Sequence, residues 1–269
     1  MASMRGGLQA AGALAAALCL AAAGPAAPQN ASPAAPQNLD GLGRAEAARG
    51  ARALDGASFA LQSGAVVRLA GLNIPPVEAP FAENARAALD ALVRDRDVTL
   101  RAAGDRRDRR GRTVAHVWTD SGDWVQGALL SAGLARVETA PGAAELAVDM
   151  LAAEQAARAA GRGLWADPDW SVMGPDPYAL AQRLDTFQIV EGIVVETAET
   201  RDFAYLNFGL DYRTDFTVSI RLRDLDDLRE ERLDPMALAG ARIRVRGYVH
   251  AVNGPMIDLD HAAQIEILD

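Results

Sequence analysis

The chain has 269 residues, of which 27 are basic and 36 acidic, and every basic residue is an arginine. Residues 1–50 hold 3 arginines and 2 acids, residues 51–170 hold 14 and 16, and residues 171–269 hold 10 and 18, so the net charges are +1, −2 and −8. This distribution excludes a uniformly basic nucleic-acid-binding surface, and any phosphate site has to be a local cluster of arginines.

Cysteine and histidine usage excludes several kinds of metal site. Cys19 is the only cysteine, so an intrachain disulfide and a cysteine-based metal site are excluded. The three histidines show no metal-ligand spacing; they are His116, His250 and His261.

The N-terminus has the pattern of a secretory signal peptide. Arg5 precedes an apolar stretch over residues 8–20, and three alanines at 21–23 offer a small-residue cleavage site. We therefore expect a signal peptide at residues 1–23, an exported protein (periplasmic or secreted), and no transmembrane segment in the mature chain. Lipid anchoring at Cys19 and an uncleaved membrane anchor are the alternatives. Residues 24–51 repeat the string AAPQN and contain few large apolar residues, which predicts a disordered linker.

The sequence pattern predicts a first folded domain at residues 52–168. Apolar residues recur at helical spacing in the segment 82–93, whereas short apolar runs bounded by turn residues indicate strands. The expected strands are 59–61, 65–72, 97–102 and 113–118, and the expected helices are 82–93, 125–132 and 143–160. A small five-stranded barrel with helices packed on it accommodates this order.

A second domain follows a proline-containing linker at residues 169–185, which has room for a short helix over 178–183. Residues 186–269 show five strand-like runs with a polar helical segment, 225–231, between the third and the fourth. The runs are 188–196, 204–208, 216–222, 241–251 and 256–259. Three strands, a helix and two strands again fit a five-stranded barrel.

The first domain also contains six segments in a recognisable order: LDGASFAL, VRLAGLNIPP, AENARAALDALV, DRRGRTVAHVW, VQGALLSAGLARV and AAEQAARAAGRGLW. Together they resemble the thermonuclease (staphylococcal nuclease-like) family over residues 52–167. The resemblance implies an OB-fold barrel and calcium-dependent hydrolysis of DNA and RNA phosphodiesters. The strings YLNFG, DFTVSI and GARIRVRGYVHAVNGPMIDL resemble OB-fold domains appended to exported proteins of this kind. The expected fold is therefore mainly β with helices (α+β), with two OB-fold barrels.

The family's functional residues are carried over only in part. The two arginines of its site fall on Arg68 and Arg112, which are relics of that site under this interpretation. The resemblance places the family's two metal-binding aspartates on Ala57 and Asn73 and its glutamate base on Pro76. The position whose backbone carbonyl binds the metal falls on Ile74.

All three carboxylates are therefore missing. Because calcium binds hard anionic oxygens and proline cannot accept a proton, we expect no metal at this site and little hydrolysis. An active calcium-dependent phosphodiesterase with a rearranged acidic site, such as Glu78 and Asp55, is the alternative. The simpler interpretation is that Asp55 is a turn residue without a role in the site.

An arginine-rich segment, residues 101–112, is the candidate for binding single-stranded nucleic acid. Its guanidinium groups suit phosphate, but the segment also fits a solvated turn whose charges pair with Asp105 and Asp108. The arginines that we expect to bind are Arg106, Arg107, Arg109 and Arg110.

The second domain offers aromatic and cationic side chains that could bind a single strand. Strand alternation places about half of them in a core, and the net charge of −8 favours packing or binding of a protein partner instead. The candidates are Tyr205, Phe208, Tyr212, Arg244, Arg246 and Tyr248. His116 and Trp165 are expected to be packing residues. The predicted function is an exported thermonuclease-like protein that binds nucleic acid or another partner without efficient cleavage.

Overall fold

The computed structural model describes residues 35–268, apart from the side chains of Asp105 and Arg106. The expected signal peptide and residues 24–34 of the expected linker lie outside the described residues. The described residues belong to one compact unit.

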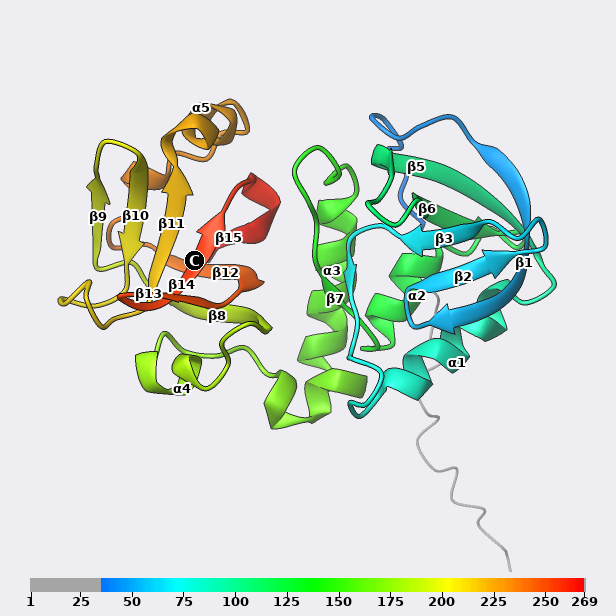
Figure 1. Cartoon of the computed structure of the whole chain (residues 1–269), viewed down its shortest axis with the longest axis horizontal. Coiled ribbons are helices and arrows are strands. Elements are labelled where there is room, and N and C mark those ends of the chain that lie inside the picture. The colour runs from blue at the N-terminus through cyan, green and yellow to red at the C-terminus, as the bar shows by residue number, and fades with distance from the viewer. Residues whose placement is uncertain (1–34, 269) are drawn as a thin grey trace, which may run out of the picture. The chain divides into compact units, whose positions relative to one another are not determined.

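Five strands close into a barrel in the N-terminal half of the described chain, in the order β1-β2-β3-β6-β5 (Figure 1). We call it the N-terminal barrel. Its first and last strands pair with each other, which leaves no free edge, and β3 and β6 run parallel. The predicted barrel is confirmed in this region. Its strands are β1 (Glu46–Asp55), β2 (Ser58–Leu61), β3 (Val66–Leu69), β5 (Asp97–Arg107) and β6 (Thr113–Thr119).

Three helices pack on the barrel: α1 (Ala82–Val93), α2 (Val125–Ser131) and α3 (Ala147–Ala159). The first coincides with the predicted segment, and its buried residues Ala85, Leu89 and Val93 recur at intervals of four residues. The third begins four residues later than expected, because a bridge between Ala140 and Ala143 and a positive φ at Gly142 form a turn there. A short pair, β4 (Leu72–Asn73) with β7 (Arg136–Val137), joins the segments that follow β3 and α2.

The sequence analysis missed β1, part of which lies in the predicted linker. Its sequence, EAARGARALD, contains no β-branched or aromatic residue, so it lacks the composition of a strand. Gly50 is required within it, because a Cβ there would clash with the Val93 carbonyl at the end of α1. The side chains of Ala35, Leu39 and Leu42 also pack against the barrel core, so the predicted linker is too long at its C-terminal end.

Residues 187–268, here called the C-terminal lobe, form two sheets around a second hydrophobic core. The larger sheet has the order β13-β14-β11-β10-β9 and the smaller one β15-β12-β8. The strands are β8 (Phe187–Ile193), β9 (Glu196–Glu199), β10 (Phe203–Asn207), β11 (Thr217–Arg221), β12 (Arg242–Tyr248), β13 (His250–Val252), β14 (Gly254–Leu259) and β15 (Ile265–Leu268), and α5 (Leu222–Glu230) follows β11.

The second closed barrel that the sequence predicted is not present in this lobe. One edge of β12 pairs with β8 and the other with β15, a strand that the sequence analysis missed. Within the described strands no ladder joins β12 to β14, so the two sheets stay separate. The lobe still shares one feature with the N-terminal barrel, since its β11 and β14 pair in parallel as β3 and β6 do.

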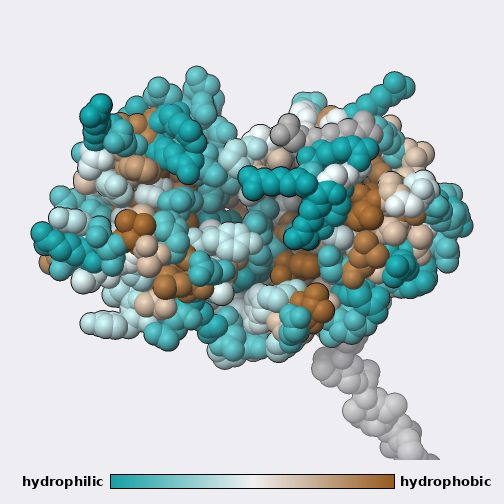
Figure 2. Space-filling view, in the orientation of Figure 1, coloured by the Kyte–Doolittle hydropathy of each residue, from teal (hydrophilic) through white to brown (hydrophobic). Residues whose placement is uncertain are grey.

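The segment between the two regions is structured, in contrast to the predicted linker. It contains three short helices: η1 (Gly163–Ala166), η2 (Pro168–Trp170) and α4 (Pro177–Ala181). Two more short 3-10 helices, η3 (Pro235–Ala237) and η4 (Ala262–Gln264), lie in the C-terminal lobe. Leu180 of α4 is buried in the second core. None of the helices formed by residues 35–268 is long and apolar enough to cross a membrane. On the face drawn in Figure 2, hydrophilic side chains predominate and hydrophobic ones form only small groups.

Candidate phosphate site and adjoining cavity

The structure brings Arg68 and Arg112 together at one point of the N-terminal barrel. Arg68 lies on β3 opposite Ser58 of β2, and Nη1 of Arg112 donates to the Ser58 hydroxyl at 3.1 Å. Burial lowers the pKa of Arg68 and the charge of Arg112 lowers it further, whereas Asp55 and Glu138 oppose the shift. Nη2 of Arg68 donates to the Leu72 carbonyl at 2.8 Å, which fixes its direction.

The turn before β6 is organised by Asp108. Its Oδ1 accepts the backbone N–H groups of Arg110 and Arg112, both at 2.9 Å, and its Oδ2 accepts Nε of Arg112 at 2.7 Å. Partial burial opposes a low pKa for Asp108, but these bonds and the charge of Arg112 outweigh it and lower the pKa. The carboxylate of Asp108 therefore forms its ion pair with the Arg112 guanidinium.

The loop arginines differ in how they are placed. Arg107 is exposed and donates to the Gly111 carbonyl at 2.8 Å. Arg109 and Arg110 are exposed, and their side chains form no ion pair with any side chain in the described part of the chain. The Arg106 side chain lies outside the described residues.

The three positions assigned to carboxylates do not form a calcium site. Ala57 is fully buried, and its N–H donates to Asp55 Oδ1 at 2.8 Å. Asp55 therefore stabilises the turn, as its simpler interpretation predicted. Asn73 Oδ1 accepts from Arg136 at 3.0 Å, while its Nδ2 donates to Glu138 at 2.8 Å. Pro76 lies exposed on the following loop. Since Ala57 has no side-chain oxygen and that of Asn73 is already used, these residues do not fit calcium.

No three His, Cys, Asp or Glu side chains in residues 35–268 gather closely enough to hold a metal ion. Glu78, the expected substitute base, is exposed and does not line the adjoining cavity.

Glu138 is a site residue that the sequence analysis missed. It follows β7, and the pairing of β7 with β4 brings it beside Asn73 and Arg68. Burial raises its pKa, although the bond from Asn73 and the charge of Arg68 act in the opposite direction. It faces Tyr248 of β12, whose pKa is raised first by burial and then by the charge of Glu138. No motif marks Glu138 in the sequence, because a contact 65 residues away places it.

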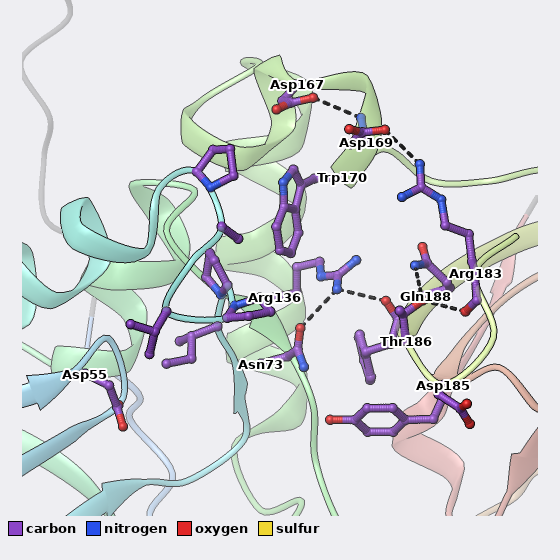
Figure 3. A pocket seen from close by; sticks show the side chains of 18 residues that line it. Asp55, Asn73, Arg136, Asp167, Asp169, Trp170, Arg183, Asp185, Thr186 and Gln188 are labelled. Atoms are coloured by element: carbon purple, nitrogen blue, oxygen red, sulfur yellow. Dashed lines mark hydrogen bonds and ion pairs between the residues drawn. The ribbon is translucent and has the colours of Figure 1, made fainter.

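A cavity of about 550 Å³ adjoins this group (Figure 3). Asp55, Asn73 and Tyr248 line it, so it shares residues with the surroundings of Arg68. Arg136 forms part of its wall: the guanidinium carbon lies 4.8 Å from the Trp170 ring centroid and 5.0 Å from that of Phe187. Its Nη2 donates to Asn73 and, at 2.8 Å, to the Phe187 carbonyl. A hydrogen-bonded chain therefore runs from Arg136 through Asn73 to Glu138.

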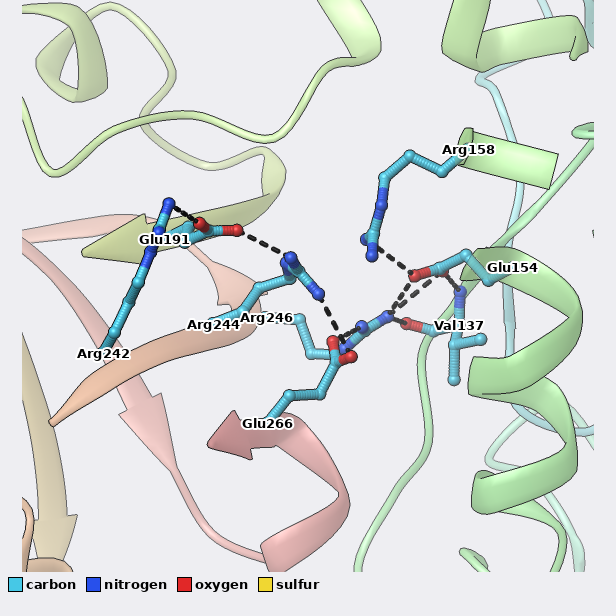
Figure 4. Close-up of polar contacts among 8 residues, drawn as sticks. All are labelled: Val137, Glu154, Arg158, Glu191, Arg242, Arg244, Arg246 and Glu266. Carbon is cyan, nitrogen blue, oxygen red and sulfur yellow. Dashed lines mark hydrogen bonds and ion pairs between the residues drawn. The ribbon is translucent and has the colours of Figure 1, made fainter. Parts of the chain in front are cut away.

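The C-terminal arginines are placed differently from the expectation (Figure 4). Arg244 pairs with Glu191 at 2.6 Å and with Glu266 at 3.2 Å. Arg246, 1% exposed, pairs with Glu154 of α3 at 3.0 Å and with Glu266 at 2.5 Å. Both guanidinium groups form ion pairs with carboxylates, so neither is available to bind phosphate. Through its pair with Glu154, Arg246 joins the C-terminal lobe to α3.

The candidate aromatic residues of that lobe are also mostly occupied. Phe208 is buried against Phe216, and Tyr205 is half-buried and stacks on Phe203. Tyr212 and Tyr248 remain exposed.

His116 and Trp165 lie where packing residues are expected. His116 is 1% exposed, its ring centroid is 5.9 Å from that of Trp124, and burial lowers its pKa to about 4. Trp165 is half-buried under Arg158 of α3, with the guanidinium carbon 5.8 Å from the ring centroid.

The chain was compared with protein families and with curated proteins. A search of curated proteins found none that matches the chain. A scan of protein families matched residues 66–167 to the family described as Staphylococcal nuclease homologue. The match begins at β3 and ends after η1, so it includes Arg68, Arg112 and all of α1, α2 and α3. This part of the chain, residues 66–167, is therefore similar to staphylococcal nuclease homologues, and we call it the nuclease-like domain.

Proposed function

We propose that the nuclease-like domain binds the phosphate backbone of single-stranded nucleic acid at Arg68 and Arg112 and hydrolyses it inefficiently. The observation that carries this proposal is that both arginines lie beside Ser58. Arg68 pairs with Ser58 between β3 and β2, the Arg112 guanidinium donates to the Ser58 hydroxyl, and the charge of Arg112 acts on Arg68. Burial is the main cause that lowers the pKa of Arg68, and the charge of Arg112 lowers it further. A phosphate placed between the two guanidinium groups relieves their mutual repulsion.

Poor hydrolysis follows from the same site. Phosphodiester cleavage needs stabilisation of charge on the phosphoryl oxygens and a base that activates water. The arginines can supply the first, but Ala57, Asn73 and Pro76 supply neither a metal nor a base. A positioned base alone contributes about 10²–10⁴-fold in rate.

The exposed arginines of the loop support the same proposal. Arg107, Arg109 and Arg110 precede Arg112 directly and extend the positive surface along which a strand can lie. We further propose that the protein is exported and that the C-terminal lobe, an OB-like module in strand order, serves to pack against the nuclease-like domain or to bind a protein.

An active phosphodiesterase is the second candidate, and Glu138 is the observation that favours it. This carboxylate lies beside Arg68, and burial has raised its pKa toward the range of a general base. In this alternative, Glu138 acts as the base that the sequence analysis assigned to Glu78.

The decisive measurement is fluorescence anisotropy with a labelled single-stranded oligonucleotide. The double variant Arg68→Ala, Arg112→Ala should lose at least about tenfold in affinity, since a hydrogen bond to a charged group is worth about 1.5–3 kcal/mol. The salt slope of log K should fall by about 0.7, which is the value for one phosphate on a single strand. The matched control is Arg49→Ala, an exposed arginine near the start of β1, which should change neither quantity. Unchanged binding by the double variant would refute the proposal.

A plasmid-nicking assay with and without calcium separates the two candidates. We expect no calcium-dependent cleavage and, by calorimetry, no calcium binding below millimolar concentration. Cleavage that Glu138→Gln abolishes would favour the active enzyme instead.

A further inference from the structure

The cavity beside the arginine pair contains an unusual buried charge. Arg136 is 4% exposed, and no carboxylate within the described chain lies within ion-pairing distance of it. Burial is the main cause that lowers its pKa to about 10, so it remains a cation at neutral pH. Its Nη2 is fixed by two oxygens, but Nε is buried without a hydrogen-bond partner in the described residues. A buried donor of this kind carries a desolvation cost that a ligand can remove.

Gln188 of β8 contains a buried acceptor that has no partner in the described part of the chain and so complements the unpaired donor of Arg136. It lines the cavity, is 5% exposed, and donates from its Nε2 to the Thr186 hydroxyl at 2.8 Å. Oε1 is buried and has no donor among the described residues. Figure 3 shows the Arg136 guanidinium and the Gln188 amide on facing sides of the same space. The cavity therefore offers an unmatched donor on one side and an unmatched acceptor on the other.

The walls of the cavity suit a flat and uncharged ligand. Trp170 is half-buried there, and Tyr248 and Pro75 also contribute to the lining. The carboxylates of Asp55, Asp167, Asp169 and Asp185 surround the space, whereas only Arg136 and Arg183 are cationic. This balance of four negative charges to two positive ones repels a phosphate group. A neutral aromatic ring with both donors and acceptors on its edge has no such penalty.

We propose that this cavity binds one nucleobase of the strand whose phosphate contacts Arg68 and Arg112. The base stacks on Trp170, accepts from Arg136 and donates to Gln188. Because Asn73 and Asp55 belong to both the cavity and the surroundings of Arg68, phosphate and base of one strand can be held together. The inference rests on the proposed function, and it assigns a role to residues 168–188 and to Tyr248, which lie outside the nuclease-like match.

The experiment compares two labelled single strands of equal length and phosphate number, an oligothymidylate and its fully abasic counterpart. We expect the full chain to bind oligothymidylate more tightly by about 5- to 150-fold, which is the contribution of one stacked base. Trp170→Ala should abolish most of this ratio and leave the affinity for the abasic strand unchanged. The matched control is Tyr212→Ala, an exposed aromatic residue of the C-terminal lobe away from the cavity, which should leave both affinities unchanged.

Gln188→Leu provides a second variant that retains the wall but removes the acceptor. It should reduce the ratio several-fold, and it keeps the test informative if Trp170→Ala does not fold. Equal affinity of the wild-type chain for both strands would overturn the inference, as would a ratio that neither variant changes. Failure of the proposed function looks different, because the double variant Arg68→Ala, Arg112→Ala would then bind the abasic strand as tightly as the wild type does.

Discussion

Arginine side chains in the N-terminal barrel and in the C-terminal lobe have opposite surroundings. In the lobe, Arg244 and Arg246 contact two carboxylates each and form a buried network with α3. In the nuclease-like domain, Arg68 and Arg136 are also largely buried, yet neither forms an ion pair with a carboxylate in the described part of the chain. The number of arginines in a segment therefore says little about phosphate binding, because the nearby carboxylates decide whether the charge is available.

The largest expected effect tests the structural role of the lobe's arginines. Glu154 is fully buried, pairs with Arg246 and accepts the Val137 N–H at 2.6 Å. Glu154→Gln should lower the free energy of unfolding by about 3 kcal/mol, because it leaves Arg246 buried and only partly neutralised. Urea unfolding gives this value, and affinity for single-stranded DNA should stay unchanged. The matched control is Asp97→Asn, which breaks the exposed pair with Arg49 and should cost less than about 1 kcal/mol. Equal losses in the two variants would contradict the buried network.

The next effect concerns His116, a buried histidine of the N-terminal barrel. His250 and His261 of the lobe each contact an aspartate, at 3.1 Å and 2.6 Å, whereas Nδ1 of His116 has no partner among the described residues. Burial lowers the pKa of His116 from 6.5 to about 4. Its contribution to stability is therefore complete above pH 6.5 and is lost as the pH falls toward 4, because the unfolded state then binds the proton.

The expected loss is about 3 kcal/mol, because a tenfold difference in proton affinity between the folded and unfolded states corresponds to about 1.4 kcal/mol. It is measured as the difference between the wild type and His116→Phe in urea unfolding at three pH values between the pKa of the folded state and neutrality. The Phe ring fills a similar space and does not titrate. Parallel pH profiles for the two proteins would show that His116 is not buried as a neutral ring.

The smallest effect sharpens the contrast between exposed arginines of the two regions. Changing Arg107, Arg109 and Arg110 together to Glu should reduce the salt slope for single-stranded DNA by about 2, from roughly 0.7 for each lost phosphate contact. Changing Arg213, Arg221 and Arg223, which are also exposed but on the C-terminal lobe, should leave the slope unchanged. The slope comes from anisotropy titrations between low and moderate salt. The opposite result would place the strand on the C-terminal lobe.

Most of the fold was accessible from local sequence patterns. Helix 82–93 was predicted at its observed bounds, since its apolar spacing has a clear helical period. The strand β1 was missed because alanines and arginines dominate it. The strand β15 at the C-terminus, which pairs with β12, was also missed.

Only part of the candidate site could be predicted from the sequence. Motif position suggested Arg68 and Arg112, which remain predictions, whereas Arg136 and Glu138 reach Asn73 only through the pairing of β4 with β7. Such pairing depends on a two-residue ladder between segments far apart in the sequence, and nothing local in either segment encodes it. Gln188 and Trp170 were likewise interpreted as part of a strand and a linker, because only the folded chain brings them to the cavity.

The hydrogen-bonded position of Asn73 also determines how this chain would respond to a carboxylate there. Replacing Asn73 by aspartate would remove the donor that Glu138 now uses and set a second negative charge beside it. The same carboxylate would accept from Arg136, a buried cation with no ion-pair partner in the described part of the chain. One side chain therefore balances a buried acid against a buried base, and an aspartate would exchange the bond to Glu138 for an ion pair with Arg136.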